Sequence, residues 1–587
     1  MSSIFGYFGK HSPGLIDKMG NILSHRHKNG YKTYSQKDAN NKCLEVGRGK
    51  VTYSSPLCIS VPEQRFFLTY TGVIPNFDET MFSQEKIKSF LSDPLRVLNE
   101  LTKLDGIFVL VCRVGDVLYL MRDPAGAKVI YWTENKGNLL FSNEIKALFA
   151  DSTISRKLRK QAILEYFTFS FIPGENTMLE GVKELQPGHI LEFSKGRIRT
   201  INYFPFETYE KIETMDFETS KKLLRKELEV YMNQYEKFIK TPLVFLSGGI
   251  DSSAVLAITA LKYGKKAVRT ISIHFGTGYT NENEFAQMMV DKYDTNHSYL
   301  EITPKSFRKE FKKIIWYLDD PIGDPVTIPN YLISKEASKY TDVILNGEGG
   351  DPCFGGPKNI PMLLSLLYGA PQENLQSNWM EDNYLLSYQR GYRDIEHLLE
   401  PSFYKKTEGK EGLYSILRPY FQAKSPVSFI NKLMKINIQL KGGNLILPKV
   451  DKMTSVNGIL PLSPLFSKRM IQLSMETSAQ WKLNGNIEKW ILKKAVEDCV
   501  PTPILQRPKS GMKVPVRFWF QKELKSMAKE ILSKKRIQSH EIFRYDYIKS
   551  LIKYDLEVSN GARQGLKLWM LITFMAWYEQ MIESFGV

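Results

Sequence analysis

The spacing of hydrophobic positions changes near residue 205 of this 587-residue chain. Before that point, short β-rich segments such as 106–114 (GIFVLVCRV) alternate with turns, and helical stretches near residues 14–24 and 156–168 interrupt them. Segments rich in β-branched and aromatic residues are typical of strands with at least one buried face. We therefore predict stacked sheets with helices, an α+β sandwich, over residues 1–205.

After residue 205 a polar stretch leads into a predicted long helix, from about Lys221 to Lys240, and strands then alternate with helices. The apolar runs of strand length are PLVFL (242–246), VRTISIHF (268–275), HSYLEI (297–302) and DVILNG (342–347). This alternation predicts a doubly wound parallel sheet, in which ligands bind beyond the carboxyl ends of the strands. We predict an α/β fold overall, with one domain at residues 1–205 and a second, with helical additions, at residues 206–587.

Composition narrows the class of protein. With 43% hydrophobic and 24% charged residues and no low-complexity tract, the chain is typical of a globular enzyme. Its five cysteines form no CxxC pair, which argues against disulfides and structural zinc and favours a cytoplasmic protein. The start lacks the pattern of a signal peptide, and the longest apolar run, 568–578, is short for a membrane span and predicts a buried helix. No membrane partner is expected.

The net charge of +17 is spread along the whole chain. A diffuse positive charge suits ATP and an acidic substrate. No RNA-binding signature accompanies it, and the reactive cysteine pair that RNA sulfur transfer usually needs is missing. We therefore expect no nucleic-acid partner.

A glycine-rich loop, SGGIDSS (247–253), lies between the run PLVFL and a predicted helix. Its glycines let backbone amides turn inward, and amides at a helix amino terminus form a phosphate cradle together with serine hydroxyls. Asp251 in this loop is a candidate magnesium ligand. The loop is neither a Walker loop nor a dinucleotide-binding GxGxxG loop. It resembles the SGGxDS loop of ATP pyrophosphatases, which bind the leaving pyrophosphate and release AMP.

The loop alone also fits tRNA-modifying sulfur transferases, GMP synthetase and NAD synthetase, so the motifs elsewhere in the chain decide. In chain order these are DGIF (105–108), RDPAG (122–126), FSNEIK (141–146), LDDPIGDP (318–325), NGEGGD (346–351), PKVDK (448–452), EKWILK (488–493) and RPKSGM (507–512). Together they resemble the asparagine synthetase family over essentially the whole chain. The resemblance implies a class II glutamine amidotransferase-like domain with an Ntn-hydrolase-like sandwich, followed by an ATP pyrophosphatase domain.

The resemblance also implies a mechanism. A substrate carboxylate attacks the α-phosphorus of ATP to give an acyl-adenylate and pyrophosphate, and an amine or ammonia then attacks the acyl carbon. Glu348 is the implied base for the amine, Lys489 the cation that stabilises the acyl-adenylate, and Asp251 and Asp351 the ligands of Mg²⁺. The residues expected to contact ATP or pyrophosphate are Leu246, Ser247, Gly248, Gly249, Asp251, Ser252, Ser253, Ser272, Gly347, Arg507 and Lys509.

The amino-terminal domain departs from the family pattern. Ser2 stands where glutamine-using members have the nucleophilic cysteine. The glutamine-pocket segment RGPDG is RHKNG at 26–30, and NGEIYN is TGVIPN at 71–76, without the oxyanion-hole asparagine. Since each of these losses impairs catalysis, we predict that glutamine hydrolysis is lost.

The second half departs as well. The family's ExRxPFLD segment is LPLSPLFS at 460–467, and Pro352 replaces the glutamate after Asp351. Loss of the glutamate and arginine argues against aspartate as substrate. We predict an amide-bond synthetase of natural-product or peptide metabolism, similar to β-lactam synthetases and lasso-peptide cyclases.

Three other interpretations stay open at this point: a true asparagine synthetase that uses aspartate with ammonia or glutamine, an RNA-modifying enzyme, and a nucleotide-binding scaffold without turnover. The expected partners are a small-molecule or peptide carboxylate and an amine or ammonia donor, and the expected cofactors are ATP and Mg²⁺. The sequence leaves open the oligomeric state, with a homodimer as one option, and the role of residues 357–447, which are predicted to be helical.

Overall fold

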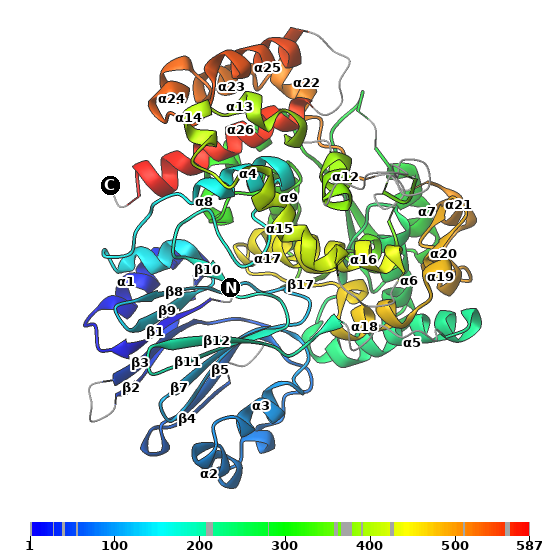
Figure 1. Cartoon of the computed structure of the whole chain (residues 1–587). Helices are drawn as coiled ribbons and strands as arrows, with labels where there is room; N and C mark the ends of the chain where they lie inside the picture. The colour runs from blue at the N-terminus through cyan, green and yellow to red at the C-terminus, as the bar shows by residue number, and fades with distance from the viewer. Residues whose placement is uncertain are drawn as a thin grey trace.

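The computed structural model describes residues 3–27, 29–37, 42–53, 57–206, 215–279, 281–356, 362–364, 378–388, 391–422, 428–508, 511–557 and 564–585. Figure 1 shows the amino-terminal sheets at the lower left and a larger, mostly helical body beside and above them. We call residues 3–206 the first module and residues 215–585 the second module.

The first module contains two antiparallel six-stranded sheets, with the orders β10-β8-β9-β1-β3-β2 and β12-β11-β7-β6-β5-β4. Their strands are β1 (Ile4–Lys10), β2 (Tyr31–Lys37), β3 (Lys42–Gly49), β4 (Cys58–Val61), β5 (Phe66–Val73), β6 (Ile107–Val114), β7 (Val117–Arg122), β8 (Tyr131–Asn135), β9 (Asn138–Ser142), β10 (Lys183–Glu184), β11 (His189–Ser194) and β12 (Arg197–Asn202). The predicted sandwich is confirmed. Its helices α1 (Leu15–Ile22) and α4 (Lys160–Phe169) match the predicted ones, whereas α2 (Gln84–Ser92) and α3 (Arg96–Leu101) have no counterpart in the prediction.

Strand β6 shows why its sequence is an unbroken apolar run. Val109 and Val111 pack into the core between the two sheets, while Leu110 and Cys112 pack on the other face with residues of α2 and α3. Both faces are therefore buried, and neither face selects for polar residues.

The second module is built on a parallel sheet with the order β15-β14-β13-β16-β17, which confirms the predicted doubly wound fold. Its strands are β13 (Leu243–Phe245), β14 (Arg269–His274), β15 (Asn296–Glu301), β16 (Val343–Leu345) and β17 (Leu460–Leu462). The helices nearest the sheet are α5 (Phe217–Tyr235), α6 (Ile250–Tyr263), α7 (Asn283–Tyr293), α8 (Pro304–Leu318), α9 (Thr327–Ala337), α10 (Gly350–Phe354), α16 (Phe429–Ile436), the π-helix η9 (Asn437–Ile446), α17 (Leu447–Ser455), α18 (Lys468–Glu476) and α20 (Trp490–Ala495). The chain leaves β13 for β14 on one side and returns to β16 on the other, so the strand order reverses between β13 and β16.

The long helix α5 begins earlier than the predicted start at Lys221. The Asp216 side chain accepts a hydrogen bond from the backbone nitrogen of Thr219 at 2.9 Å and caps the first turn. The helix also ends earlier, at Tyr235, where a short 3-10 turn continues to Phe238. A local capping contact therefore moved a boundary that periodicity alone placed only approximately.

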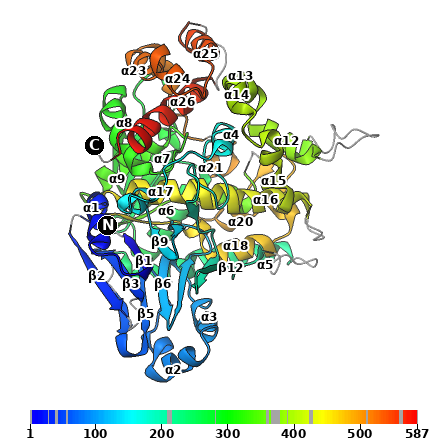
Figure 2. The same ribbon diagram turned by 60° about the vertical axis from the view of Figure 1, so that its left-hand side comes forward.

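Further helices cover the sheet and extend the second module. Figure 2 shows α23 (Lys525–Ile531), α24 (Lys534–Ser539), α25 (Tyr545–Glu557) and α26 (Gln564–Tyr578) at the end of the molecule opposite the first-module sheets. The apolar run 568–578 forms most of α26, where Trp569 and Trp577 are buried, so the predicted buried helix is confirmed. Among the described helices, none has both the length and the apolar character that a membrane span requires.

Buried charges join the two modules. Lys128 of the first module pairs with Asp451 on α17, and both side chains are almost completely buried. Arg122 donates a hydrogen bond to the carbonyl oxygen of Gly443 in η9 at 2.8 Å. A Cβ at Gly443 would lie 2.4 Å from a side-chain carbon of Pro187, so the first module packs directly on η9. The first module therefore supports two helices of the second module.

Replacing Lys128 with methionine tests this support. The substitution leaves the buried Asp451 carboxylate without its ammonium partner, and we expect it to lower the free energy of unfolding by about 3–5 kcal/mol. The double variant Lys128→Met/Asp451→Asn removes both charges and is expected to lose less. Urea denaturation of the single and double variants measures the difference, and equal losses in both would contradict a charge-specific role.

We expect the pH dependence of the free energy of unfolding to reflect the protonation of Asp320, which lies at the same interface between the modules. Burial raises the pKa of this carboxyl from 3.8 to about 7, against the opposing charge of Lys452, and its side chain accepts a hydrogen bond from the backbone nitrogen of Met178 at 3.1 Å. The folded protein therefore holds a proton that the unfolded chain releases near pH 4. The stabilising contribution is complete below that pH and is lost as the pH rises through about 7.

The variant Asp320→Asn keeps the acceptor oxygen but cannot ionise. We expect its free energy of unfolding to fall less than that of the unsubstituted protein between pH 5 and pH 8. Urea denaturation across this range measures the free energy of unfolding of both proteins. Subtracting one pH profile from the other removes the contributions of titrating groups that both proteins share, such as Asp123. Parallel pH profiles would contradict the assignment to Asp320.

Candidate active site

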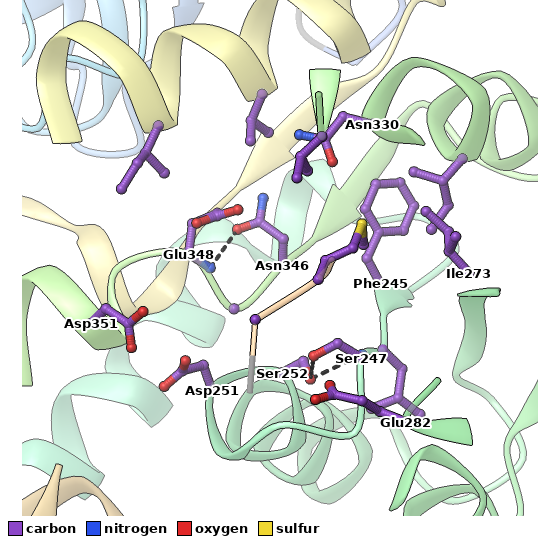
Figure 3. A pocket seen from close by; sticks show the side chains of 18 of the residues that line it. Phe245, Ser247, Asp251, Ser252, Ile273, Glu282, Asn330, Asn346, Glu348 and Asp351 are labelled. Carbon is purple, nitrogen blue, oxygen red and sulfur yellow. Dashed lines mark hydrogen bonds between the residues drawn. The ribbon is translucent and has the colours of Figure 1, made fainter. Parts of the chain in front are cut away.

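A cavity of about 570 Å³ lies where the strand order reverses, beyond the carboxyl ends of β13, β14 and β16, and η9 and α17 contribute to its wall. Figure 3 shows Asp251 and Asp351 directed toward one another, with Glu348 and Asn346 beside them. Of the residues singled out from the sequence, the lining includes Leu246, Ser247, Asp251, Ser252, Ser272, Gly347, Glu348, Asp351 and Arg507. Gly248, Gly249, Ser253 and Lys489 are not part of this lining, and Lys509 lies outside the described residues.

The loop between β13 and α6 is shaped by its own serines. The Ser252 hydroxyl lies 3.1 Å from the Ser247 hydroxyl and accepts a hydrogen bond from the Ser247 backbone nitrogen, also at 3.1 Å. The Ser247 hydroxyl accepts a further bond from the backbone nitrogen of Gly249 at 3.3 Å. Gly248 has φ 77°, and a Cβ there would lie 2.6 Å from the backbone nitrogen of Ala286, so glycine is required. The loop leads into the amino terminus of α6, an arrangement suited to phosphate.

Lys489, the residue before α20, joins the two predicted metal ligands. Its side chain is buried, and its Nζ lies 2.5 Å from Oδ2 of Asp251 and also pairs with Asp351. Lys489 has φ 57°, in the left-handed region that non-glycine residues rarely adopt. Residues predicted to hold a metal and to stabilise an adenylate therefore form one charged cluster.

The cluster also fits a magnesium ion. Asp251 and Asp351 supply carboxylate oxygens from the first turns of α6 and α10, and Mg²⁺ usually combines one or two carboxylates with phosphate oxygens and water. Within the described parts of the chain, no group of three or more His, Cys, Asp or Glu side chains is arranged to hold a metal ion. Phosphate oxygens would therefore have to complete the coordination.

The loop 346–349 brings Glu348 into the cavity. Its backbone nitrogen donates a hydrogen bond to the side-chain oxygen of Asn346 at 3.0 Å, and that oxygen also accepts one from the Ser463 hydroxyl at 2.8 Å. A Cβ at Gly347 would lie 2.5 Å from the backbone nitrogen of Ser252, so this loop packs closely on the phosphate loop. The base candidate and the phosphate cradle are held together by backbone packing.

Another part of the cavity wall contains Leu246, Ser272 and Arg507, which the sequence predicts to contact ATP or pyrophosphate. The Ser272 hydroxyl donates a hydrogen bond to the carbonyl oxygen of Leu246 at 2.5 Å. Arg507 pairs with Glu282, and its guanidinium carbon lies 4.0 Å from the centroid of the Phe285 ring. These two contacts fix Arg507 at the cavity wall, where its charge faces the region expected to hold phosphates.

Some residues of the cavity were not assigned a role from the sequence. Lys449 on α17 pairs with Asp324 at 2.6 Å, and both line the cavity. Lys441 of η9 and Asn330 of α9 line it too. Lys449 and Asp324 lie within motifs that carry the family resemblance, so their motif membership was the available signal. Lys441 lies in residues 357–447, which are predicted to be helical and contain no motif that indicates a ligand.

Sequence comparisons agree with this geometry. The sequence model of asparagine synthase matches residues 241–579, which is more than half of the chain. The chain belongs to the asparagine synthase family. The sequence model of the glutamine amidotransferase domain matches residues 1–204, so both halves of the family arrangement are present.

Relatives in the asparagine synthase family span most of the chain. The chain is 27% identical over 564 residues to the glutamine-hydrolysing asparagine synthetase 1 of Bacillus subtilis strain 168, covering 90% of this chain and 87% of that protein. It is 26% identical over 431 residues to asparagine synthetase 3 of the same strain, covering 69% and 67%. The predicted resemblance is confirmed, and the protein is a ligase that forms carbon–nitrogen bonds, in a family that uses ATP.

Proposed function

We propose that the protein is an AMP-forming amide-bond synthetase that activates a carboxylic acid other than aspartate and joins it to an amine or ammonia. The reaction proceeds without glutamine hydrolysis and belongs to natural-product or peptide metabolism. The observation that carries the synthetase proposal is the cluster of Lys489, Asp251 and Asp351 beside Glu348 and the phosphate loop. It combines two carboxylates and a base that line one cavity with a buried cation that pairs with both carboxylates, as acyl transfer through an adenylate requires.

Each residue has a defined task in the proposed reaction. The substrate carboxylate attacks the α-phosphorus of ATP, and pyrophosphate leaves into the loop that contains Ser247 and Ser252. Lys489 offsets the negative charge of the adenylate, and Glu348 removes a proton from the amine as it attacks the acyl carbon and AMP leaves. Mg²⁺, held by Asp251 and Asp351, would neutralise charge on the phosphates.

Three positions where the family has glutamate or arginine support an acid substrate other than aspartate. Leu460 and Leu462 stand at the family's glutamate and arginine positions, and both are fully buried in β17. Pro352 stands at the other glutamate position, buried at the start of α10. Apolar groups at these positions present no charge to a small amino-acid substrate.

The altered glutamine pocket supports loss of glutaminase activity. Arg26 is almost completely buried and pairs with Glu144, so its guanidinium is committed to the protein interior. The ring of His27 lies 3.2 Å from the Ser3 hydroxyl and stacks near Phe5, with ring centroids 6.0 Å apart. Ser2 and Lys28 lie outside the described residues. Arg26 and His27, the first two residues of the segment that corresponds to the family's glutamine-pocket segment, are therefore packed inward here, whereas Asn29 is exposed.

Pyrophosphate release from Mg-ATP, measured with candidate acids in parallel arms containing glutamine, ammonium, an organic amine or no nitrogen donor, tests the proposal. We expect release to depend on a particular acid, with glutamine adding nothing beyond ammonium. Acid-dependent release with aspartate would favour a true asparagine synthetase instead. Amide formation driven by glutamine would show that Ser2 works as a nucleophile, and ATP binding without release under any condition would favour a scaffold.

A further inference from the structure

A second cavity, of about 410 Å³, lies at the seam between the two modules and shares no lining residue with the active-site cavity. The start of β6, the helix α5 and the start of α18 contribute its wall. Helices α5 and α18 contact one another there, and Figures 1 and 2 show both next to the first-module sheets. The cavity therefore exists only when both modules are assembled.

A carboxyl group and an amino group line this cavity but do not form an ion pair with one another. Asp105 of the first module and Lys468 of α18 both line it, and neither forms an ion pair within 4.0 Å with any residue that the structure describes. Burial raises the pKa of Asp105 and lowers the pKa of Lys468, and each shift is only partly opposed by the charge of the other group. By contrast, Glu227 and Arg469 at the same cavity lie 3.4 Å apart and form a pair. Asp105 and Lys468 are therefore partly dehydrated and have no ion-pair partner among the described residues.

Part of the cavity wall is apolar. Ile107, Leu447 and Phe466 line the cavity together with two alanines, and Leu447 and Phe466 are buried in the core of the second module. A carboxylate, an ammonium and an apolar surface are the three features that recognise the carboxylate, the ammonium and the side chain of an apolar amino acid. A free carboxylic acid or a simple amine would leave one of the two half-buried charged groups without a partner.

We propose that the seam cavity is a binding site for a zwitterionic amino acid with an apolar side chain. Asp105 accepts hydrogen bonds from the ligand ammonium, Lys468 donates to its carboxylate, and Phe466 contacts its side chain. The site lies behind the catalytic loop, because Ser463 also lines the seam cavity and donates to Asn346, which lines the active site. A Cβ at Gly349 would lie 2.7 Å from Cβ of Phe466. Loop 346–349, which contains Glu348, therefore packs against Phe466, the residue proposed to contact the ligand side chain.

Isothermal titration of the full-length protein with three probes tests the site: L-leucine, leucinamide, which lacks the carboxylate, and 4-methylpentanoate, which lacks the amine. We expect saturable leucine binding and at least about tenfold weaker binding of each single-charge probe. No saturable leucine binding at millimolar concentration, or equal binding of all three probes, would overturn the proposal.

Two variants separate recognition from general damage. Asp105→Asn is expected to weaken leucine about tenfold or more while sparing 4-methylpentanoate, and Lys468→Met to weaken leucine while sparing leucinamide. Lys88→Met, an exposed lysine on α2 outside the lining, is the matched control and should bind leucine normally. Thermal denaturation confirms that the variants are folded. Leucine binding unchanged in both cavity variants would also overturn the site, independently of whether the synthetase reaction is established.

Discussion

Replacing Lys489 with methionine is expected to reduce pyrophosphate release by at least about a hundredfold, because a preorganised cation aimed at developing charge typically contributes this much or more. The ammonium is buried and pairs with both Asp251 and Asp351. The variant also leaves the Asp251 and Asp351 carboxylates without the ammonium between them. Their mutual repulsion then raises the free energy of the ionised pair in the free protein. Steady-state release from Mg-ATP at saturating acid measures the effect.

A matched control is available on α20, which follows Lys489. Lys494 is half-buried and pairs with Glu497 at 2.8 Å, so Lys494→Met removes one lysine charge without touching the cluster. We expect this control to retain activity within about twofold, since ion pairs open to solvent contribute little. Circular dichroism at the assay temperature has to show that Lys489→Met is folded. A folded Lys489→Met variant with near-normal turnover would remove Lys489 from the chemistry.

The amino-terminal module has a structural role beside the synthetase cavity, which does not depend on glutaminase activity. The contact that provides this role lies in η9. This π-helix faces the active site through Lys441 and contacts the first module through Gly443, whose carbonyl accepts from Arg122. π-helical turns are rare and cost hydrogen-bond geometry, so they persist where packing holds them. Loss of the first module would therefore disturb the wall of the synthetase cavity directly.

Sequence reasoning located the phosphate loop and its neighbours because their signals are local. The SGGIDSS segment combines a strand, two glycines and a helix start within a few residues, and each part has a local conformational reason. The same holds for loop 346–349, where Gly347 and Gly349 permit the close backbone packing seen in the structure. The alternation of strands and helices then placed both loops at one edge of a sheet.

The remaining contacts depend on residues far apart in the chain, and no periodicity encodes them. The role of Lys489 is predicted from a motif, and its position between Asp251 and Asp351 follows only from how α20 packs against α5 and α10. The pair of Lys449 and Asp324 and the facing charges of Asp105 and Lys468 have the same origin. Partners of this kind are set by tertiary packing, which single-sequence patterns do not specify.

Replacing Glu348 with glutamine is expected to separate the two halves of the reaction. Glutamine keeps the size of the side chain but cannot accept a proton from the attacking amine, so amide formation should fall by about 10²–10⁴-fold. Adenylation does not require this base, and isotope exchange between pyrophosphate and ATP in the presence of the acid should stay within a few-fold of normal. The residual amide rate should rise with pH toward the pKa of the amine, because only unprotonated amine can attack.

The control is Glu301→Gln, a substitution at the end of β15 and outside the cavity lining. If exchange and amide formation fall together, Glu348 acts before the adenylate forms, and the base must be sought among the other carboxylates that line the cavity, such as Asp324.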